Sequence, residues 1–462
     1  MNHKTWFLIL TTILAALLLS SAVTVLPFVR PAEAQGQLTR EMRNWEYING
    51  PRTGSNYNPQ NIINQETVKH LELKWVYPIP SAAQLGGGDA FVGFGNLAEG
   101  SMAPPLVIDG IVYTLLNRKT VVAMDASDGS ILWTYENSAN NDELAMQNGG
   151  LYPVRPQGTH SHGMYYEDGL LWFNDFGCQA TALNAETGEI ARELKDLCLD
   201  FTLDVNDPRG WGIETNSGLY SGAGGHPGMI YKAGNTLIWN TGGSSEGTWG
   251  GRMFVAGFDV NTGDLKWRTF LMPPCGDPTT CGPGLDGPLF LAEKAEWGQW
   301  LVDNCDKIWI SMLTGQQIKA CQMDQDILRN DWGPMRSNSG ISNVWGQMAI
   351  DEEKGVVYFG MAQAGPDYNA TYRPGPNLFG AAVLALNANN GELIWAHQTT
   401  AHDLWDFDCS WNTILTTTTV LGQERDVLIK GCKNGIVYVF DADTGEALHM
   451  LEAPIIRRTP NA

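Results

Sequence analysis

Short runs of alternating apolar and polar residues recur along the 462-residue chain, and five of them share one spacing. In each, an apolar run ends at an Asp or Asn, and a Gly follows four residues later. Alternation with a period of two is typical of a β-strand, and the Gly supplies the positive φ that a tight turn requires. Each unit is therefore predicted to be a β-hairpin, and the five hairpins lie within residues 122–133, 181–192, 255–267, 383–395 and 437–449.

A tryptophan closes three of the five units. Trp133, Trp267 and Trp395 each stand eight residues after the Asp or Asn, whereas Arg192 and His449 occupy that position in the other two. A large flat ring at the same place in successive units can bury apolar area against the next unit, so that sheets dock around a ring. We interpret these tryptophans as scaffold. Because strand-like segments dominate elsewhere too, the pattern predicts an all-β fold, built as one repeat domain.

The first 34 residues have the pattern of an export signal. A basic start precedes an apolar run of 21 residues from Trp6 to Leu26, and the small-residue stretch Ala32 to Ala34 follows. Cleavage after Ala34 is favoured over an uncleaved membrane anchor, although the apolar run is long enough to span a bilayer. Residues 35–462 are then expected to fold in the periplasm or outside the cell.

Charge and cysteine content narrow the classes of partner. The formal net charge of −21 argues against nucleic acid as a partner. An acidic surface could attract a basic electron-acceptor protein, or could simply keep the protein in solution, and both interpretations stay open. No CxxCH haem-attachment motif occurs in the sequence, so electrons from any redox reaction would need a separate acceptor.

Eight cysteines in an exported chain favour disulfides over metal thiolates. Four of them, Cys275, Cys281, Cys305 and Cys321, fall in a long excursion over residues 273–340, between the third and fourth hairpins. We expect this excursion to be stapled by disulfides, to cap a cavity and to set specificity. The sequence alone does not assign the pairs.

The five units resemble the tryptophan docking motifs of the pyrroloquinoline quinone (PQQ) dehydrogenases, a family of eight-bladed β-propellers. The segment from Trp45 to Trp75 is similar to the family's N-terminal segment, and WAHQTTAHDLWDFDCSWN, from Trp395 to Asn412, resembles its active-site strand and loop. The resemblance implies a propeller with about five to six of eight blades present. It also suggests a gene fragment or a ring that another chain completes.

The same resemblance implies cofactor contacts at five positions. Asp406 corresponds to the catalytic base, Trp345 to the tryptophan beneath the PQQ plane, and Lys433 to the cation that contacts the quinone oxygens. His162 stands in place of an Arg that contacts PQQ, and Ser245 is a further expected contact. Taken singly, Trp345 could be a core residue and Lys433 a surface charge, and His162 could pair with His160 to line the channel.

A cation site is also implied, for Ca²⁺ or a lanthanide, with departures from the family pattern. The expected ligands are Glu246, Gln363, Asp406 and Asp408; Glu246 fits only with a two-residue shift, and Gln363 replaces an Asn. Asp408 is expected on the same side of an extended strand as Asp406. In some family members an extra Asp at this place marks a lanthanide site, but a solvated carboxylate or a turn cap is an equal alternative.

These features lead to one main hypothesis about function. The chain is expected to be a PQQ-dependent oxidoreductase that oxidises an alcohol or sugar hydroxyl, with Asp406 as general base and a separate cytochrome as electron acceptor. The alternatives are a non-enzymatic propeller that serves as an interaction scaffold, and an inactive fragment. The group formed by Trp345, Asp406 and Lys433 separates them, because a scaffold has no reason to keep it.

Overall fold

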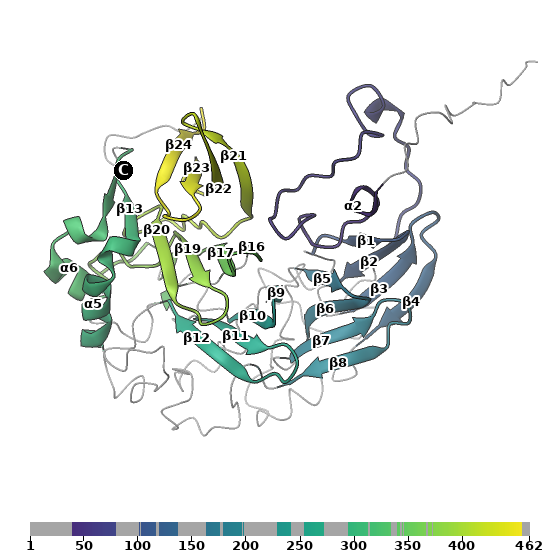
Figure 1. The fold of residues 1–462 in the computed structure, drawn as a ribbon, viewed down its shortest axis with the longest axis horizontal. Coiled ribbons are helices and arrows are strands. Elements are labelled where there is room, and N and C mark those ends of the chain that lie inside the picture. Colours follow the sequence, from purple (N-terminus) through teal and green to yellow (C-terminus); the bar gives the residue numbers. More distant parts are fainter. Residues whose placement is uncertain are drawn as a thin grey trace, which may run out of the picture.

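Five sheets of four or more strands follow one another around an arc in the computed structural model of the protein (Figure 1). The structure describes residues 39–79, 101, 103–116, 120–136, 163–175, 179–195, 197, 229–241, 254–271, 294–312, 315–333, 340–341, 344, 346–365, 368–371 and 373–454. Within these residues no helix is long and apolar enough to cross a membrane.

Four of the sheets have four strands each, joined in sequence order. The first comprises β1 (Leu106–Ile108), β2 (Ile111–Leu115), β3 (Val121–Asp125) and β4 (Ile131–Tyr135). The second comprises β5 (Met164–Glu167), β6 (Leu170–Asp175), β7 (Gln179–Asn184) and β8 (Ile190–Leu194). The third comprises β9 (Tyr231–Ala233), β10 (Thr236–Thr241), β11 (Phe254–Asp259) and β12 (Leu265–Phe270). The fifth comprises β21 (Thr413–Val420), β22 (Gln423–Gly431), β23 (Ile436–Asp441) and β24 (Ala447–Glu452).

The fourth sheet has the same core of four strands, with two more at its outer edge. Its core strands are β16 (Ala349–Asp351), β17 (Val356–Gly360), β19 (Ala382–Asn387) and β20 (Leu393–Gln398). From the excursion come β13 (Ile308–Ser311), which pairs parallel with β20, and β14 (Gln317–Lys319). The described part of the excursion therefore covers the outer edge of this sheet. The expectation that the excursion caps a cavity and sets specificity stays a prediction.

Short elements complete the described chain. The excursion carries α5 (Lys294–Asp303), α6 (Gln325–Arg329) and two 3₁₀ turns, η3 (Cys305–Lys307) and η4 (Ala320–Gln322). The N-terminal region has α2 (Arg40–Arg43) and η1 (Val68–His70), and β15 (Gly340–Ile341) pairs with β18 (Ala364–Gly365). These sheets are the blades of a propeller, as the all-β prediction required, with each predicted hairpin forming the two outer strands of one blade.

One interaction recurs between neighbouring blades. The Nε1–H of Trp133 donates to Ala185 O (3.1 Å), that of Trp267 to Ala388 O (3.0 Å) and that of Trp395 to Ala442 O (2.8 Å). In each case the ring covers the Gly of the same turn, where a Cβ would collide with the indole. Trp75, from the N-terminal region, docks on the first blade in the same way, with its Nε1–H donating to Ala126 O (3.0 Å).

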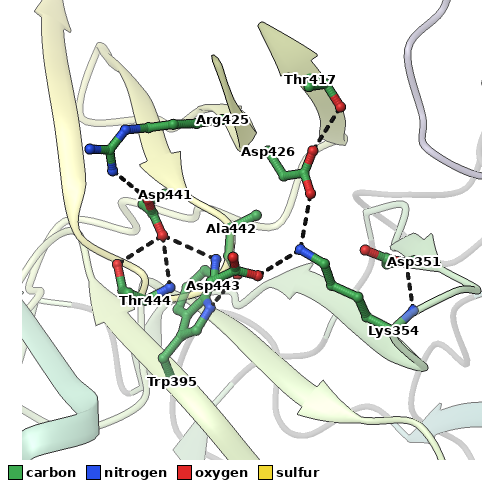
Figure 2. Close-up of polar contacts among 10 residues, drawn as sticks. All are labelled: Asp351, Lys354, Trp395, Thr417, Arg425, Asp426, Asp441, Ala442, Asp443 and Thr444. Carbon is green, nitrogen blue, oxygen red and sulfur yellow. Dashed lines mark hydrogen bonds and ion pairs between the residues drawn. The ribbon is translucent and has the colours of Figure 1, made fainter. Parts of the chain in front are cut away.

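Arg192 replaces the tryptophan between the second and third blades. Its guanidinium donates to Asn261 O (2.7 Å), so a hydrogen bond to the next turn remains although the indole does not. Between the fourth and fifth blades, ion pairs add to the docking of Trp395, as Figure 2 shows. There Lys354 reaches Asp426 (2.9 Å) and Asp443 (2.7 Å), which links a turn of the fourth blade to the fifth.

The N-terminal segment of residues 45–54 contacts all five blades. Trp45 N–H donates to Val107 O, and Glu46 O accepts from Tyr166 N–H, on the innermost strands of the first two blades. Arg52 donates to Lys232 O of the third blade and pairs with Glu352 beside the fourth, and Thr53 O accepts from Leu415 N–H of the fifth. In Figure 1 the purple segment lies between the first and fifth blades. It therefore fastens the inner strands to one another.

We predict that Trp395→Ala lowers the free energy of unfolding by about 3–5 kcal/mol, because it empties a fully buried site between two blades. Urea denaturation measures the loss. Trp405→Ala is the control: its side chain is 61% exposed, and the expected change is below about 1 kcal/mol. Equal losses in the two variants would contradict the docking role.

A lysine is buried where the fourth and fifth blades meet. Lys430, on β22, is fully buried, and its ammonium group has Thr413 Oγ1 as a hydrogen-bond partner at 3.2 Å. Burial lowers the pKa of Lys430 well below its ordinary value. The unfolded chain therefore binds a proton that the folded chain resists, and stability should rise with pH below the unfolded pKa of 10.5.

We predict that Lys430→Met removes this pH dependence, because the methionine keeps most of the apolar stem without an amine. Between pH 7 and pH 9 the free energy of unfolding of the unmodified protein should rise relative to the variant by up to about 1.4 kcal/mol per pH unit. Urea titrations at several pH values measure the difference. Parallel curves for the two proteins would show that Lys430 stays charged in the fold.

Candidate active site

Three connections meet at one end of the fourth and fifth blades. They are the loop after β17, the loop from β20 to β21, and the turn from β22 to β23. Because β17 and β20 both run antiparallel to β19, their C-terminal ends lie at the same end of the fourth blade. These connections carry Gln363, the pair Asp406 and Asp408, and Lys433.

The structure brings a lysine between two aspartates. Lys433 Nζ lies 2.8 Å from Asp406 Oδ2 and 2.7 Å from Asp408 Oδ2. Solvent reaches 25% of the Asp406 side chain and 35% of that of Lys433, but only 5% of that of Asp408. The group is therefore a partly open charge cluster with one buried carboxylate.

The surroundings of Asp408 are held by backbone hydrogen bonds. Its Oδ1 accepts from Gln363 N–H (2.8 Å), and its carbonyl oxygen accepts from Lys433 N–H (2.9 Å). Burial raises the pKa of Asp408 to about 7, while the hydrogen bond from Lys433 lowers it and the Asp406 charge raises it. The solvated alternative for Asp408 is therefore wrong, and its carboxylate needs a nearby positive charge to stay ionised near neutral pH.

Lys433 responds in the opposite direction. Burial lowers the pKa of its ammonium group, but the hydrogen bonds to Asp406 and Asp408 outweigh that effect and raise the pKa above its ordinary value. Lys433 is therefore an ion-paired cation and not an isolated surface charge. Its neighbour Asn434 fixes the turn, because the Asn434 amide donates to Thr399 O (3.3 Å) and to Tyr438 Oη (2.9 Å).

The expectation of an extended strand through Asp406 and Asp408 is wrong. Residues 399–412 form a loop, and Asp406 has a φ of 61°, in the left-handed region that few residues other than Gly adopt. The two carboxylates nevertheless converge, because both reach the same ammonium group. A left-handed aspartate beside a charge cluster is the kind of strained residue that clusters at functional sites.

A disulfide joins two of the connections beside the charge cluster. Cys409 follows Asp408 in the chain, Cys432 precedes Lys433, and the two cysteines are bonded to each other with a Cα–Cα distance of 4.4 Å. In the excursion, Cys305 pairs with Cys321. Sequence alone could not assign either pair, and it missed that one of them tethers Asp408 to Lys433.

Several predicted site residues lie outside the described part of the chain. His162 and His160, Ser245, Glu246 and Trp345 all belong to this group, so their expected contacts with a cofactor or cation remain predictions. Gln363 is described and buried, and its backbone N–H donates to Asp408 Oδ1. Among the described residues no cluster of three or more His, Cys, Asp and Glu side chains could hold a metal ion.

One family model matches most of the chain. Residues 45–303 and 314–459 match the family model "Glucose/ethanol/alcohol dehydrogenase, beta-propeller domain" of the PQQ proteins. The chain belongs to this family. Because the match covers most of the chain, the predicted resemblance to the PQQ dehydrogenases is confirmed.

Relatives with known names are distant in sequence. The chain is 26% identical over 407 residues to the dehydrogenase subunit of alcohol dehydrogenase (quinone) from Gluconacetobacter polyoxogenes, which covers 87% of this chain and 45% of the relative. It is 27% identical to the putative dehydrogenase XoxF of Paracoccus denitrificans, over 88% of this chain and 55% of the relative. The chain thus spans about half the length of these relatives.

Solved structures agree on the fold. Quinohemoprotein alcohol dehydrogenase from Comamonas testosteroni superimposes with a TM-score of 0.60 at 22% identity, over 90% of this chain and 50% of that one. A europium-containing methanol dehydrogenase gives a TM-score of 0.55 at 20% identity. At such identities the likeness shows the propeller fold and nothing finer.

We predict that Cys409→Ala with Cys432→Ala lowers the free energy of unfolding by about 3 kcal/mol, the entropy of closing a loop of this size. Amide hydrogen exchange should also quicken at residues 408–412 and 431–435. The double variant Cys305→Ala with Cys321→Ala is the matched control, since it should lose similar stability without that local change. The same exchange pattern in both variants would argue against a tether at the charge cluster.

Proposed function

We propose that the chain is the propeller of a PQQ-dependent dehydrogenase that oxidises an alcohol or sugar hydroxyl, with Asp406 as the general base. The observation that carries this proposal is the convergence of Asp406, Asp408 and Lys433 at one end of two adjacent blades. Family membership supplies the class of chemistry, and the charge cluster supplies residues suited to it.

Asp406 suits the role of base. A hydroxyl must lose its proton when its carbon gives up a hydride, and a partly exposed carboxylate can accept that proton. When bound, PQQ supplies the hydride acceptor, and a cation beside it supplies Lewis acidity. Lys433 holds the carboxylate of Asp406 in place through the 2.8 Å contact. Its ammonium group could also offset negative charge that develops on a neighbouring oxygen.

The donor set fits a hard cation. Asp406 and Asp408 offer carboxylate oxygens, and the Gln363 amide could add a neutral oxygen, as such cations require. The burial of Asp408 makes a neighbouring positive charge favourable, which Lys433 supplies in this structure. We propose these three residues with Glu246 as ligands for Ca²⁺ or a lanthanide. Trp345, His162 and Ser245 are the proposed PQQ contacts.

We propose that electrons leave through a separate cytochrome. This part of the proposal follows the names of relatives, which include a dehydrogenase subunit and quinohemoprotein alcohol dehydrogenases. We also propose that the protein is exported and works in the periplasm or outside the cell.

A scaffold without enzymatic activity is the second candidate, and the charge cluster argues against it. A carboxylate that is 5% exposed lowers stability unless its charge is matched, so a propeller that only binds other proteins gains nothing by keeping it. An inactive fragment would retain the cluster as an inherited feature, and activity distinguishes that case.

We predict that Asp406→Asn lowers kcat for dye-linked alcohol oxidation by about 10²–10⁴-fold, the usual contribution of a general base. The assay uses purified protein with PQQ and either Ca²⁺ or La³⁺. Asp426→Asn is the matched control, because it also removes a carboxylate from a lysine pair, on the same blade but away from the site. A variant at Asp406 that keeps at least half of the activity would refute its role as base.

A further inference from the structure

A second aspartate controls the backbone on both sides of Asp406. Asp403 is 3% exposed, and its two carboxylate oxygens accept from different amides of the same loop. Oδ1 accepts from Trp405 N–H and Oδ2 from Phe407 N–H, each at 2.8 Å. The residues immediately before and after Asp406 are therefore tied to one buried side chain.

Asp403 is in turn anchored by a buried arginine. Arg373 is fully buried, and its guanidinium donates to the backbone carbonyl of Asp403 (2.7 Å) and to Asn377 Oδ1 (2.6 Å). Burial raises the pKa of Asp403, and the hydrogen bonds from Trp405 and Phe407 together with the charge of Arg373 offset only part of that effect. The loop that carries Asp406 thus rests on a buried polar network.

This network continues into the excursion. The carboxylate of Asp331, two residues beyond α6, accepts from the backbone N–H groups of Asn377 and Leu378. Asp331 is 1% exposed, and the Nε1–H of the adjacent Trp332 donates to Leu378 O (2.7 Å). A buried polar network favours one conformation, because another arrangement would leave more of its polar groups without a hydrogen-bond partner and away from water.

The network matters because Asp406 sits in an unfavourable conformation. A φ of 61° is unfavourable for a residue with a side chain, and it persists only where the surroundings determine it. The hydrogen bonds from Trp405 N–H and Phe407 N–H to Asp403 fix the backbone on both sides of Asp406 and so stabilise this conformation. With the backbone so held, the carboxylate of Asp406 lies 2.8 Å from Lys433 Nζ.

We propose that Asp403, anchored by Arg373, is a positioning residue that holds Asp406 in its left-handed conformation and so aims the base at the site. That this positioning serves catalysis rests on the proposed function. Asp403 touches no reacting atom in this account; it acts through the loop. The described part of the excursion reaches this network through Asp331, which bonds the backbone of Asn377, the residue that accepts from Arg373.

The test compares Asp403→Ala with Leu384→Ala, a control that empties a fully buried site on β19 of the same blade without touching the loop. Hydrogen exchange is followed at the amides of residues 404–407, and kcat and KM are measured with ethanol, PQQ and Ca²⁺ or La³⁺. Asp403→Asn serves as the conservative variant, because it keeps one of the two acceptor oxygens.

In Asp403→Ala we expect exchange at residues 404–407 to quicken about tenfold or more, and kcat to fall about 10- to 100-fold with KM within about twofold. For Asp403→Asn we expect an exchange rate and a kcat between those of Asp403→Ala and those of the unmodified protein. Leu384→Ala should lose thermal stability without either change. If Asp403→Ala behaves like Leu384→Ala, the positioning role is refuted. If the unmodified protein oxidises no alcohol, the proposed function fails, and the exchange data alone still decide whether Asp403 holds the loop.

Discussion

The contact between a tryptophan and the turn glycine of the next blade is the interaction on which the rest of the structure depends. The indole needs a flat surface, and only a Gly leaves the turn free of a side chain that would hold the ring away. Its Nε1–H then finds the same backbone carbonyl in each docked pair. Trp395 docks the fourth blade on the fifth, and the Asp406 loop that connects these two blades lies beside Lys433.

The N-terminal segment contacts the fourth and fifth blades at two levels along their strands. Arg52 pairs with Glu352, which follows β16, whereas Gln363 follows β17; because these two strands run antiparallel, the Arg52 contact lies at the end of the fourth blade opposite Gln363. Thr53 O accepts from Leu415 N–H near the start of β21, soon after the loop that carries Asp406. The segment therefore supports the two blades on which the site keeps unfavourable features such as the buried Asp408 carboxylate and the left-handed Asp406.

The features that could be predicted from the sequence depend on residues that lie close together along the chain. The period of two and the Gly spacing fix each hairpin, so the blades and the scaffold role of Trp133, Trp267 and Trp395 followed directly. Asp406, Asp408 and Lys433 lie together in the structure, whereas the roles that the resemblance implies for them stay predictions. The bond between Cys409 and Cys432, the parallel addition of β13 to β20 and the network of Arg373 with Asp331 were not predicted, because each joins segments 23 or more residues apart without a local signal.

Binding of PQQ by the unmodified protein tests the central claim most directly. A titration of the purified chain with PQQ, followed by absorbance in the presence of Ca²⁺ and then of La³⁺, measures both stoichiometry and cation dependence. We expect saturable binding of one PQQ per propeller that requires one of the two cations. Absence of saturable binding with either cation, in protein that is folded by circular dichroism, would contradict it.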